Sequence, residues 1–243
     1  MPVTLPTTKS GVDNRWISQK FGMIGAAGIG KSEFWSHGNT LYLQCEAGLN
    51  HLDVFKVPVR SWDEFRDAVG ALITAATKKD FPYDTVVIDT IDKLVDYAQA
   101  EVVMRGKEKF KNLEINTVGD LPNGQGWYQV TNLMENALSK LEELPCAVCY
   151  IGHLDNKEIK EPTRSIHKQT ISVGGKLGGM LVAWADHFLN IEAQYSGSDL
   201  RRKVRTLPTQ TLDAKSRGGV VPDGWVWDAK SQINYDKLRG LFT

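Results

Sequence analysis

The stretch FGMIGAAGIGKSEFWSH, residues 21–37, decides the fold. Its centre, GAAGIGKS at 25–32, matches the spacing G-x-x-x-x-G-K-[ST]. The apolar run before it suits a buried strand, and the residues after it suit the start of a helix. Glycines let the backbone curl so that successive N–H groups point at one anion, and the helix N-terminus adds its dipole. The stretch therefore predicts a strand, a phosphate-binding loop and a helix, in that order.

The spacing also predicts what each residue of this loop does. The loop backbone would surround the phosphates, Lys31 would reach the β- and γ-phosphates, and Ser32 would bind Mg²⁺. We therefore expect ATP and Mg²⁺ as cofactors. The predicted nucleotide-binding residues are Gly25, Ala26, Ala27, Gly28, Ile29, Gly30, Lys31 and Ser32.

A second apolar run, TVVID at 85–89, is typical of a central parallel strand. Asp89 ends this run and follows the phosphate-binding loop in the order expected of a Walker B strand, whose acid holds the Mg²⁺ shell. Ser32 and Asp89 are therefore the predicted metal residues. Thr90 and Asp92 are further candidates close by.

Strands alternate with helices along most of the chain, which indicates an α/β fold with a mostly parallel central sheet flanked by helices. Ser61 and Glu64 match a capping box and predict a helix start. Closely spaced later strands suggest an antiparallel C-terminal extension. The expected strands lie near 16–25, 41–45, 54–59, 85–89, 146–152, 187–194 and 200–208, and the expected helices after 32, after 61, from 90 to about 105, around 133–141 and near 231–241.

The chain divides into a polar, flexible N-terminal segment, 1–15, and a single domain, 16–243. Residues 106–126 are charged and then rich in Gly, Pro and Asn, and we expect a mobile insertion there. Residues 154–174 are polar and then glycine-rich. A long loop inside a compact domain is usually functional or disordered.

Composition excludes some classes of protein. The net charge of zero gives no support to DNA binding, because a protein that coats nucleic acid is usually basic. No apolar run approaches the roughly 18 residues of a membrane span, and residues 1–15 lack the apolar core of a signal peptide. We expect a cytoplasmic protein with no membrane partner. Cys146 and Cys149 form a C-x-x-C inside an apolar run, where a buried strand is a better interpretation than a metal site.

Four further features, in order along residues 16–220, resemble RecA-like ATPases, specifically small phage members related to Sak-type single-strand annealing proteins. Glu46 follows the strand at 41–45, where RecA-like proteins carry a glutamate that orients the attacking water. His153 ends the strand CYIGH, where a polar residue in the family touches the γ-phosphate and leads into a DNA-binding loop. The resemblance implies that Glu46 and His153 act in catalysis together with Lys31 and Asp89.

The third feature is the segment 154–174, which sits where RecA has its second DNA-binding loop and is followed by a similar Gly-Gly helix. Its basic excess is only one, and it has no aromatic residue for base stacking. Ile166 and Ile171 are candidates to wedge between bases instead. The DNA contacts implied here are Lys157, Lys160, Arg164 and Lys168.

The fourth feature is AKSRGG, which contains Lys215 and Arg217. In RecA-like hexamers and filaments such a pair reaches a neighbour's γ-phosphate, as an arginine finger does. Head-to-tail assembly into a ring or filament is therefore implied. Both residues belong to the basic stretch 201–217, and we assign Arg202, from its first part, to DNA.

The resemblance implies a RecA-like ATPase, stimulated by DNA, that acts on single-stranded DNA in phage-type recombination or strand annealing, with a single-strand-binding protein as a further candidate partner. Two alternatives remain open. One is a P-loop kinase or small-molecule phosphotransferase with 106–126 as its lid. The other is an interaction module, similar to a helicase loader, in which ATP is a structural switch.

Overall fold

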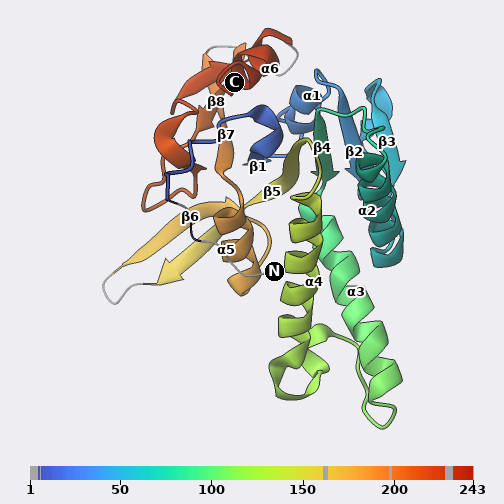
Figure 1. The fold of residues 1–243 in the computed structure, drawn as a ribbon. Coiled ribbons are helices and arrows are strands. Elements are labelled where there is room, and N and C mark those ends of the chain that lie inside the picture. The colour runs from blue at the N-terminus through green and yellow to red at the C-terminus, as the bar shows by residue number, and fades with distance from the viewer. Residues whose placement is uncertain (1–4, 6, 161–163, 197–198, 228–231, 243) are drawn as a thin grey trace.

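A central sheet organises the molecule. The computed structural model describes residues 5, 7–160, 164–196, 199–227 and 232–242, and within them ten strands form one sheet. Figure 1 shows the strands fanning across the middle of the molecule, with helices above and below. The α/β class predicted from the sequence is confirmed.

Six strands form the parallel part of the sheet, in the order β7-β1-β5-β4-β2-β3. The central strands are buried on both faces, which explains their unbroken apolar sequences. The parallel strands are β1 (Lys20–Gly25), β2 (Thr40–Gln44), β3 (Phe55–Pro58), β4 (Thr85–Asp89), β5 (Ala147–Lys160) and β7 (His187–Ser196).

The C-terminal part of the chain extends this sheet with antiparallel strands, as expected. β8 (Asp199–Arg205) pairs with β7, and β10 (Trp225–Trp227) pairs with β8. The short β9 (Lys215–Ser216) pairs with the beginning of β7. The extension therefore lies beside β7, which pairs with β1, the strand that leads into the phosphate-binding loop.

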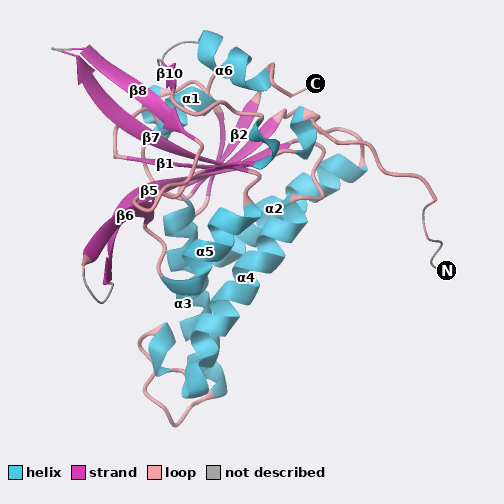
Figure 2. Cartoon of the chain, turned by 90° about the vertical axis from the view of Figure 1, so that its left-hand side faces the viewer, coloured by secondary structure: helices cyan, strands magenta, loops and turns pink. Residues whose placement is uncertain are grey.

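Helices cover both faces of the sheet and bury a separate core on each (Figure 2). One face carries α2 (Trp62–Thr77), α3 (Ile91–Lys109), α4 (Gln125–Leu141) and α5 (Gly175–Trp184). The other carries the short α1 (Lys31–Trp35) and α6 (Gln232–Arg239). Short 3-10 turns lie at Trp16–Ser18, Leu49–His51, Val118–Asp120, Pro122–Gly124 and Arg217–Gly219.

The helix start predicted at Ser61 is confirmed in detail. The Ser61 hydroxyl accepts a hydrogen bond from the backbone N–H of Glu64 at 3.1 Å, and the Glu64 carboxylate accepts one from the N–H of Arg60 at 2.7 Å. The first contact satisfies an N–H group that the first turn of α2 leaves without a helical partner, and the second ties the Glu64 carboxylate to the residue before the N-cap.

The segment 106–126, predicted as a mobile insertion, contains helical ends and two short turns. α3 continues to Lys109, two 3-10 turns follow, and α4 begins at Gln125. Ile115, Val118 and Leu121 are buried against the two helices, so the segment closes the far end of the α3–α4 hairpin (Figure 1). Three separated apolar residues in a polar stretch give no periodic signal, which is why the sequence suggested a loop.

The segment 154–174, predicted as a loop, contains a β-hairpin. β5 continues past the core to Lys160 and pairs in antiparallel register with β6 (Ser165–Ile171). Figure 2 shows this hairpin projecting away from the helices and the rest of the sheet. Most of its side chains lie at the surface, so the sequence lacks the apolar alternation that marks a half-buried strand.

The ends of the described chain differ in their surroundings. Residues 7–15 contain no helix or strand and are exposed, whereas Trp16 is buried and packs on Phe242 near the C-terminus. Within the described residues, no helix combines the length and apolar character that a membrane crossing requires.

Candidate active site

The phosphate-binding loop joins the carboxyl end of β1 to α1. Gly28 and Gly30 adopt positive φ angles of 72° and 94°, which side chains with a Cβ rarely adopt. The loop curls so that Ile29 N–H donates to the carbonyl of Ala26 at 3.3 Å. Ala26, Ala27 and Gly28 are exposed at the crest, and α1 starts directly at Lys31. This is the open cradle that phosphate oxygens require.

Lys31 lies inside this cradle with its side chain largely buried. Its ammonium donates to the carbonyls of Gly25 at 2.8 Å and Ala26 at 3.0 Å. Burial lowers the pKa of Lys31, and the nearby carboxylates of Asp89, Asp92 and Glu46 oppose that shift. The lysine is therefore held at the loop by weak neutral acceptors, which an anionic phosphate would outcompete.

Ser32 and Asp89, the two predicted metal residues, are in direct contact. The Ser32 hydroxyl donates to Asp89 Oδ2 at 2.7 Å, and Asp89 is only 7% exposed. Burial raises the pKa of Asp89, while the hydrogen bond from Ser32 lowers it. A hydroxyl and a carboxylate are the hard oxygen ligands that Mg²⁺ prefers, so the two residues fit the ion.

Glu46 lies at the same edge of the sheet. It is exposed, and its carboxylate accepts a hydrogen bond from the Thr90 hydroxyl at 3.1 Å. The N–H groups of Cys45 and Glu46 both donate to the carbonyl of Asp89, at 2.7 and 3.2 Å. The structure therefore brings Glu46 next to the metal residue, at the end of the neighbouring strand.

His153 pairs in register with Gly25 and so lies beside the start of the phosphate-binding loop. Its backbone N–H donates to Asp92 Oδ2 at 2.9 Å, and its Nδ1 lies 3.4 Å from the same oxygen. The Ser172 hydroxyl donates to the other oxygen of Asp92. Burial raises the pKa of Asp92, and the contacts with His153 oppose the shift. Asp92, a minor candidate in the sequence, therefore connects the first turn of α3 to both strands at the base of the hairpin.

Lys215 and Arg217 lie far from this cluster. β9 pairs with the beginning of β7, whose His187 is level with Phe21 near the start of β1. A strand rises about 3.3 Å per residue, so the pair is roughly one strand length from the phosphate-binding loop of its own chain. Neither side chain belongs to the nucleotide site of the same chain.

The two basic residues differ in their local contacts. The Lys215 ammonium donates to the carbonyls of Ala183 at 2.8 Å and Ala185 at 2.6 Å, which caps the C-terminal end of α5. Burial lowers the pKa of Lys215. The Arg217 side chain is 65% exposed, and its Nη1 lies 3.1 Å from Asp186 Oδ1.

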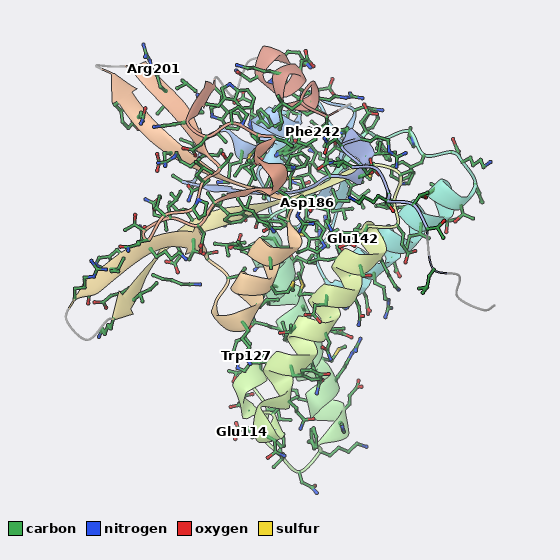
Figure 3. All side chains as sticks on the ribbon, turned by 60° about the vertical axis from the view of Figure 1, so that its left-hand side comes forward. Glu114, Trp127, Glu142, Asp186, Arg201 and Phe242 are labelled. Carbon is green, nitrogen blue, oxygen red and sulfur yellow. The ribbon has the colours of Figure 1, made fainter. Side chains whose placement is uncertain are left out.

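Arg202, on β8, contacts the phosphate-binding loop. Its Nε donates to the carbonyl of Ile29 in the phosphate-binding loop at 2.5 Å. Successive strand residues point to opposite faces, so the preceding Arg201 is exposed at the outer end of the β7–β8 hairpin (Figure 3). The Arg202 side chain therefore supports the phosphate-binding loop, and its contact with DNA stays a prediction. Nothing in the sequence placed β8 beside Ile29.

The other four candidate DNA residues do lie on the hairpin or at its end. The Lys157 ammonium donates to the carbonyl of Val173 at 3.1 Å. Lys168 pairs with Asp213 at 2.6 Å, and Lys160 lies 4.0 Å from Glu158. Arg164 is exposed beside the first residue of β6. The basic groups are thus spread along the hairpin rather than gathered in one patch.

A family model described as an AAA domain matches residues 17–218, which is most of the chain and includes the whole cluster around the phosphate-binding loop. The chain belongs to this AAA domain family. No curated protein matches the sequence. The family and the geometry of the loop together support a P-loop ATPase.

Two solved structures resemble this AAA domain protein at low sequence identity. A KaiC-like protein from the hyperthermophilic archaeon Pyrococcus horikoshii is 10% identical, with 77% of each chain covered and a TM-score of 0.42. The flagellar accessory protein FlaH from Methanocaldococcus jannaschii is 12% identical, with 83% of this chain and 80% of that chain covered and a TM-score of 0.42.

Proposed function

We propose that this protein is a Mg²⁺-dependent, RecA-like ATPase whose nucleotide state controls a single-stranded-DNA-binding hairpin, in phage-type recombination or strand annealing. The observation that carries the proposal is the position of Asp92. It lies three residues after Asp89 and contacts both His153 and Ser172, one from each side of the hairpin base. A structural change where the phosphates bind can therefore reach the hairpin through Asp92 and the two residues it contacts.

The chemistry is phosphoryl transfer to water. Bound Mg²⁺ would neutralise charge on the β- and γ-phosphates, held through Ser32 and Asp89. Lys31 moves its ammonium from the loop carbonyls to the phosphate oxygens, and the loop N–H groups bind the remaining charge. Glu46 orients the attacking water from the end of the adjacent strand, where Thr90 restrains its carboxylate.

Arg217 is the residue that suits a neighbour's site. It lies at the amino edge of the sheet, and in a head-to-tail assembly that edge of one subunit faces the carboxyl edge of the next. Its guanidinium is mostly exposed and its ion pair with Asp186 is at the surface, where such pairs contribute little stability. Lys215 would support this role by fixing the end of α5 beside it.

The test is ATP turnover with and without single-stranded DNA, in the wild-type protein and in Asp92→Asn. The amide keeps the size of the side chain but loses the negative charge that faces His153. We expect DNA to stimulate the wild type and to stimulate Asp92→Asn much less, with basal turnover nearly kept. Turnover that DNA never changes, combined with phosphate transfer to a small acceptor, would contradict the proposal and favour the phosphotransferase alternative.

A further inference from the structure

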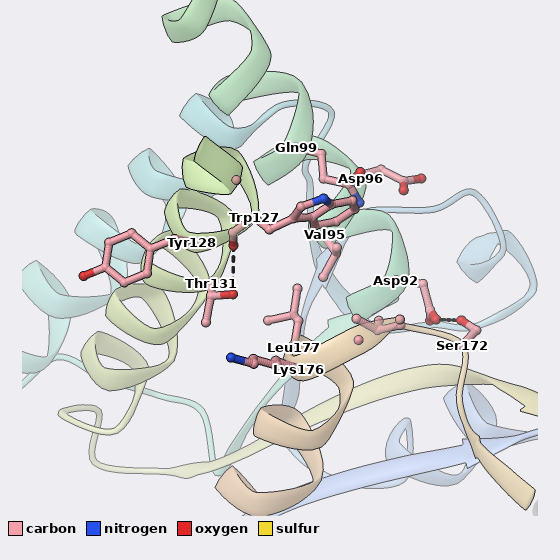
Figure 4. A pocket seen from close by; sticks show the side chains of 14 residues that line it. Asp92, Val95, Asp96, Gln99, Trp127, Tyr128, Thr131, Ser172, Lys176 and Leu177 are labelled. Atoms are coloured by element: carbon pink, nitrogen blue, oxygen red, sulfur yellow. Dashed lines mark hydrogen bonds between the residues drawn. The ribbon is translucent and has the colours of Figure 1, made fainter. Parts of the chain in front are cut away.

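A groove of about 780 Å³ opens on the α-helical face, between α3, the beginning of α4 and the turn that leads into α5. Figure 4 shows the Trp127 ring extending from α4 toward α3, above Leu177 of α5. Val95 and Val173 complete the apolar lining. The size lies within the range of about 300–1,000 Å³ that is usual for sites that bind small organic groups.

Trp127 is the unusual feature of this groove. Its side chain is large and apolar, yet the residue is 54% exposed, and the next residue, Tyr128, is 68% exposed. Adjacent exposed aromatic residues at a groove usually mark a surface that binds something. Gln99, on the opposite helix, adds an amide that both donates and accepts hydrogen bonds. The groove therefore offers a flat apolar face beside a polar edge.

The groove carries charges of both signs, and each of its two carboxylates has partners of its own. Asp92 takes hydrogen bonds from His153 and Ser172, and Asp96 pairs with Lys93 at 3.1 Å. Two lysines border the groove. Lys176 lines it directly, and the Lys157 ammonium reaches from the hairpin to the carbonyl of Val173 on its floor. The hairpin and the groove are thus continuous.

We propose that this groove receives unstacked bases of single-stranded DNA, with Trp127 as the stacking surface and the hairpin lysines along the phosphates. A nucleobase has a flat apolar face and a polar edge, which are the two surfaces that Trp127 and Gln99 present. The hairpin itself has no aromatic residue, and α4 supplies one beside it. This inference rests on the proposed function, since the hairpin must meet DNA for a base to enter the groove.

The test compares two strands of equal length, oligothymidylate and the same backbone with abasic sites, by fluorescence anisotropy at several salt concentrations. Trp127→Ala should weaken binding of oligothymidylate about tenfold and leave the abasic strand unchanged, because stacking needs a base. The salt dependence should stay the same, because no phosphate contact is lost. Trp127→Phe, which keeps an aromatic face, should retain most of the affinity.

Phe55→Ala is the matched control. Phe55 is 57% exposed on β3, at the edge of the sheet away from the groove, so its removal should change neither strand's affinity. Thermal unfolding of every variant shows whether the fold is kept.

Three results would overturn the inference. Equal affinity of wild type and Trp127→Ala for oligothymidylate would mean that Trp127 stacks no base. An equal loss on both strands would assign the groove to a structural role or to a protein partner. If the wild type binds neither strand, the proposed function itself fails, and this inference fails with it.

Discussion

The proposed ATPase uses residues from two edges of the sheet, and the residues at the carboxyl edge differ from the one at the amino edge in how far they are buried. At the carboxyl edge, Lys31 and Asp89 are buried, Ser32 is half-buried, and all three contact one another or the loop. At the amino edge, Arg217 extends into solvent. The first group has its contacts formed within one chain, whereas Arg217, which we propose acts on a neighbouring chain, is left largely exposed. The predictions below test this difference, beginning with the largest expected effect.

Removal of the buried cation should abolish productive ATP binding. In Lys31→Ala the β- and γ-phosphates lose the only lysine of the loop, and loss of one partner from a buried charged pair commonly weakens binding by a hundredfold or more. Titration with a fluorescent ATP analogue measures the effect. Thermal unfolding without nucleotide should change little, because Lys31 contacts only neutral carbonyls. Wild-type affinity in this variant would contradict the assignment of the loop.

Glu46→Gln should separate binding from chemistry at the same edge. The amide keeps the size of the side chain and the contact with Thr90, but it loses the charge that polarises the water. We expect turnover to fall by about two orders of magnitude while ATP binding is unchanged. Steady-state hydrolysis and equilibrium titration of the same preparation provide the two readings. Normal turnover would assign the role to another acid.

At the amino edge, Arg217→Ala should leave ATP binding to the isolated subunit intact and reduce turnover at least tenfold in the assembly. A mixture of Arg217→Ala with Lys31→Ala subunits provides the decisive measurement. Each variant alone has reduced or no turnover, but mixed assemblies contain some interfaces with an intact loop and an intact arginine. Recovered hydrolysis supports the trans role. Proven co-assembly without recovery would contradict it.

Arg202→Ala tests whether this part of the basic stretch 201–217 supports the nucleotide site or binds DNA. The side chain supports Ile29, so ATP binding should weaken roughly tenfold, the scale of one hydrogen bond from a charged group of about 1.5 kcal/mol. If the side chain serves the loop alone, the salt dependence of DNA binding should match that of the wild type, because the variant then removes no phosphate contact. Arg201→Ala, which alters the exposed neighbour, is the control for ATP binding. A flatter salt dependence in Arg202→Ala alone would support the DNA assignment.

The last prediction concerns the stability of the amino edge rather than binding or turnover. His187 is buried between Gln19 and Ser216, packs on Phe21 and Phe242, and has its pKa lowered to about 4 by burial. Asp186 opposes this shift, and Arg217 and Lys215 add to it. The unfolded chain binds a proton near the usual pKa of about 6.5, so this histidine costs native stability as pH falls from there toward 4.

Urea unfolding at a series of pH values measures that dependence. Over this range the wild type should lose about 2–3 kcal/mol more than His187→Gln, which keeps hydrogen-bonding capacity but has no proton to gain. Identical pH profiles for the two proteins would show that His187 is protonated in the native state as easily as in the unfolded chain.

The sequence predicted those features that depend on local spacing. The loop at 25–32, the acid at the end of β4 and the capped start of α2 each follow from residues within one turn or strand, and the structure has them. The features that it missed depend on contacts between distant residues. Arg202 meets a carbonyl 173 positions away, and Lys215 caps a helix that ends about 30 residues earlier. No local pattern encodes such partners.

The hairpin was missed for a different reason. A strand is recognised from sequence by the alternation that packing on a core imposes. Most of the outer half of β5 is only partly covered or exposed, so its side chains can be polar on both faces, and the backbone ladder with β6 helps to keep it extended. Segments selected for a solvent-facing role are therefore the ones that pattern-based inference identifies least well.

The length of that hairpin means that a small tilt at its base would move its outer end by a larger distance. Its paired strands run from the rung Leu154–Ile171 to the rung Lys160–Ser165, six steps of about 3.4 Å, which gives an arm of roughly 20 Å. Asp92 contacts His153 and Ser172 at the base of this arm. If nucleotide exchange tilts the base by about 5°, the outer rung moves by nearly 2 Å, comparable to the interhelical shifts of about 1–2 Å that operate other molecular switches. A small rearrangement around the Asp92 carboxylate would in this way produce a larger displacement at the exposed end of the hairpin.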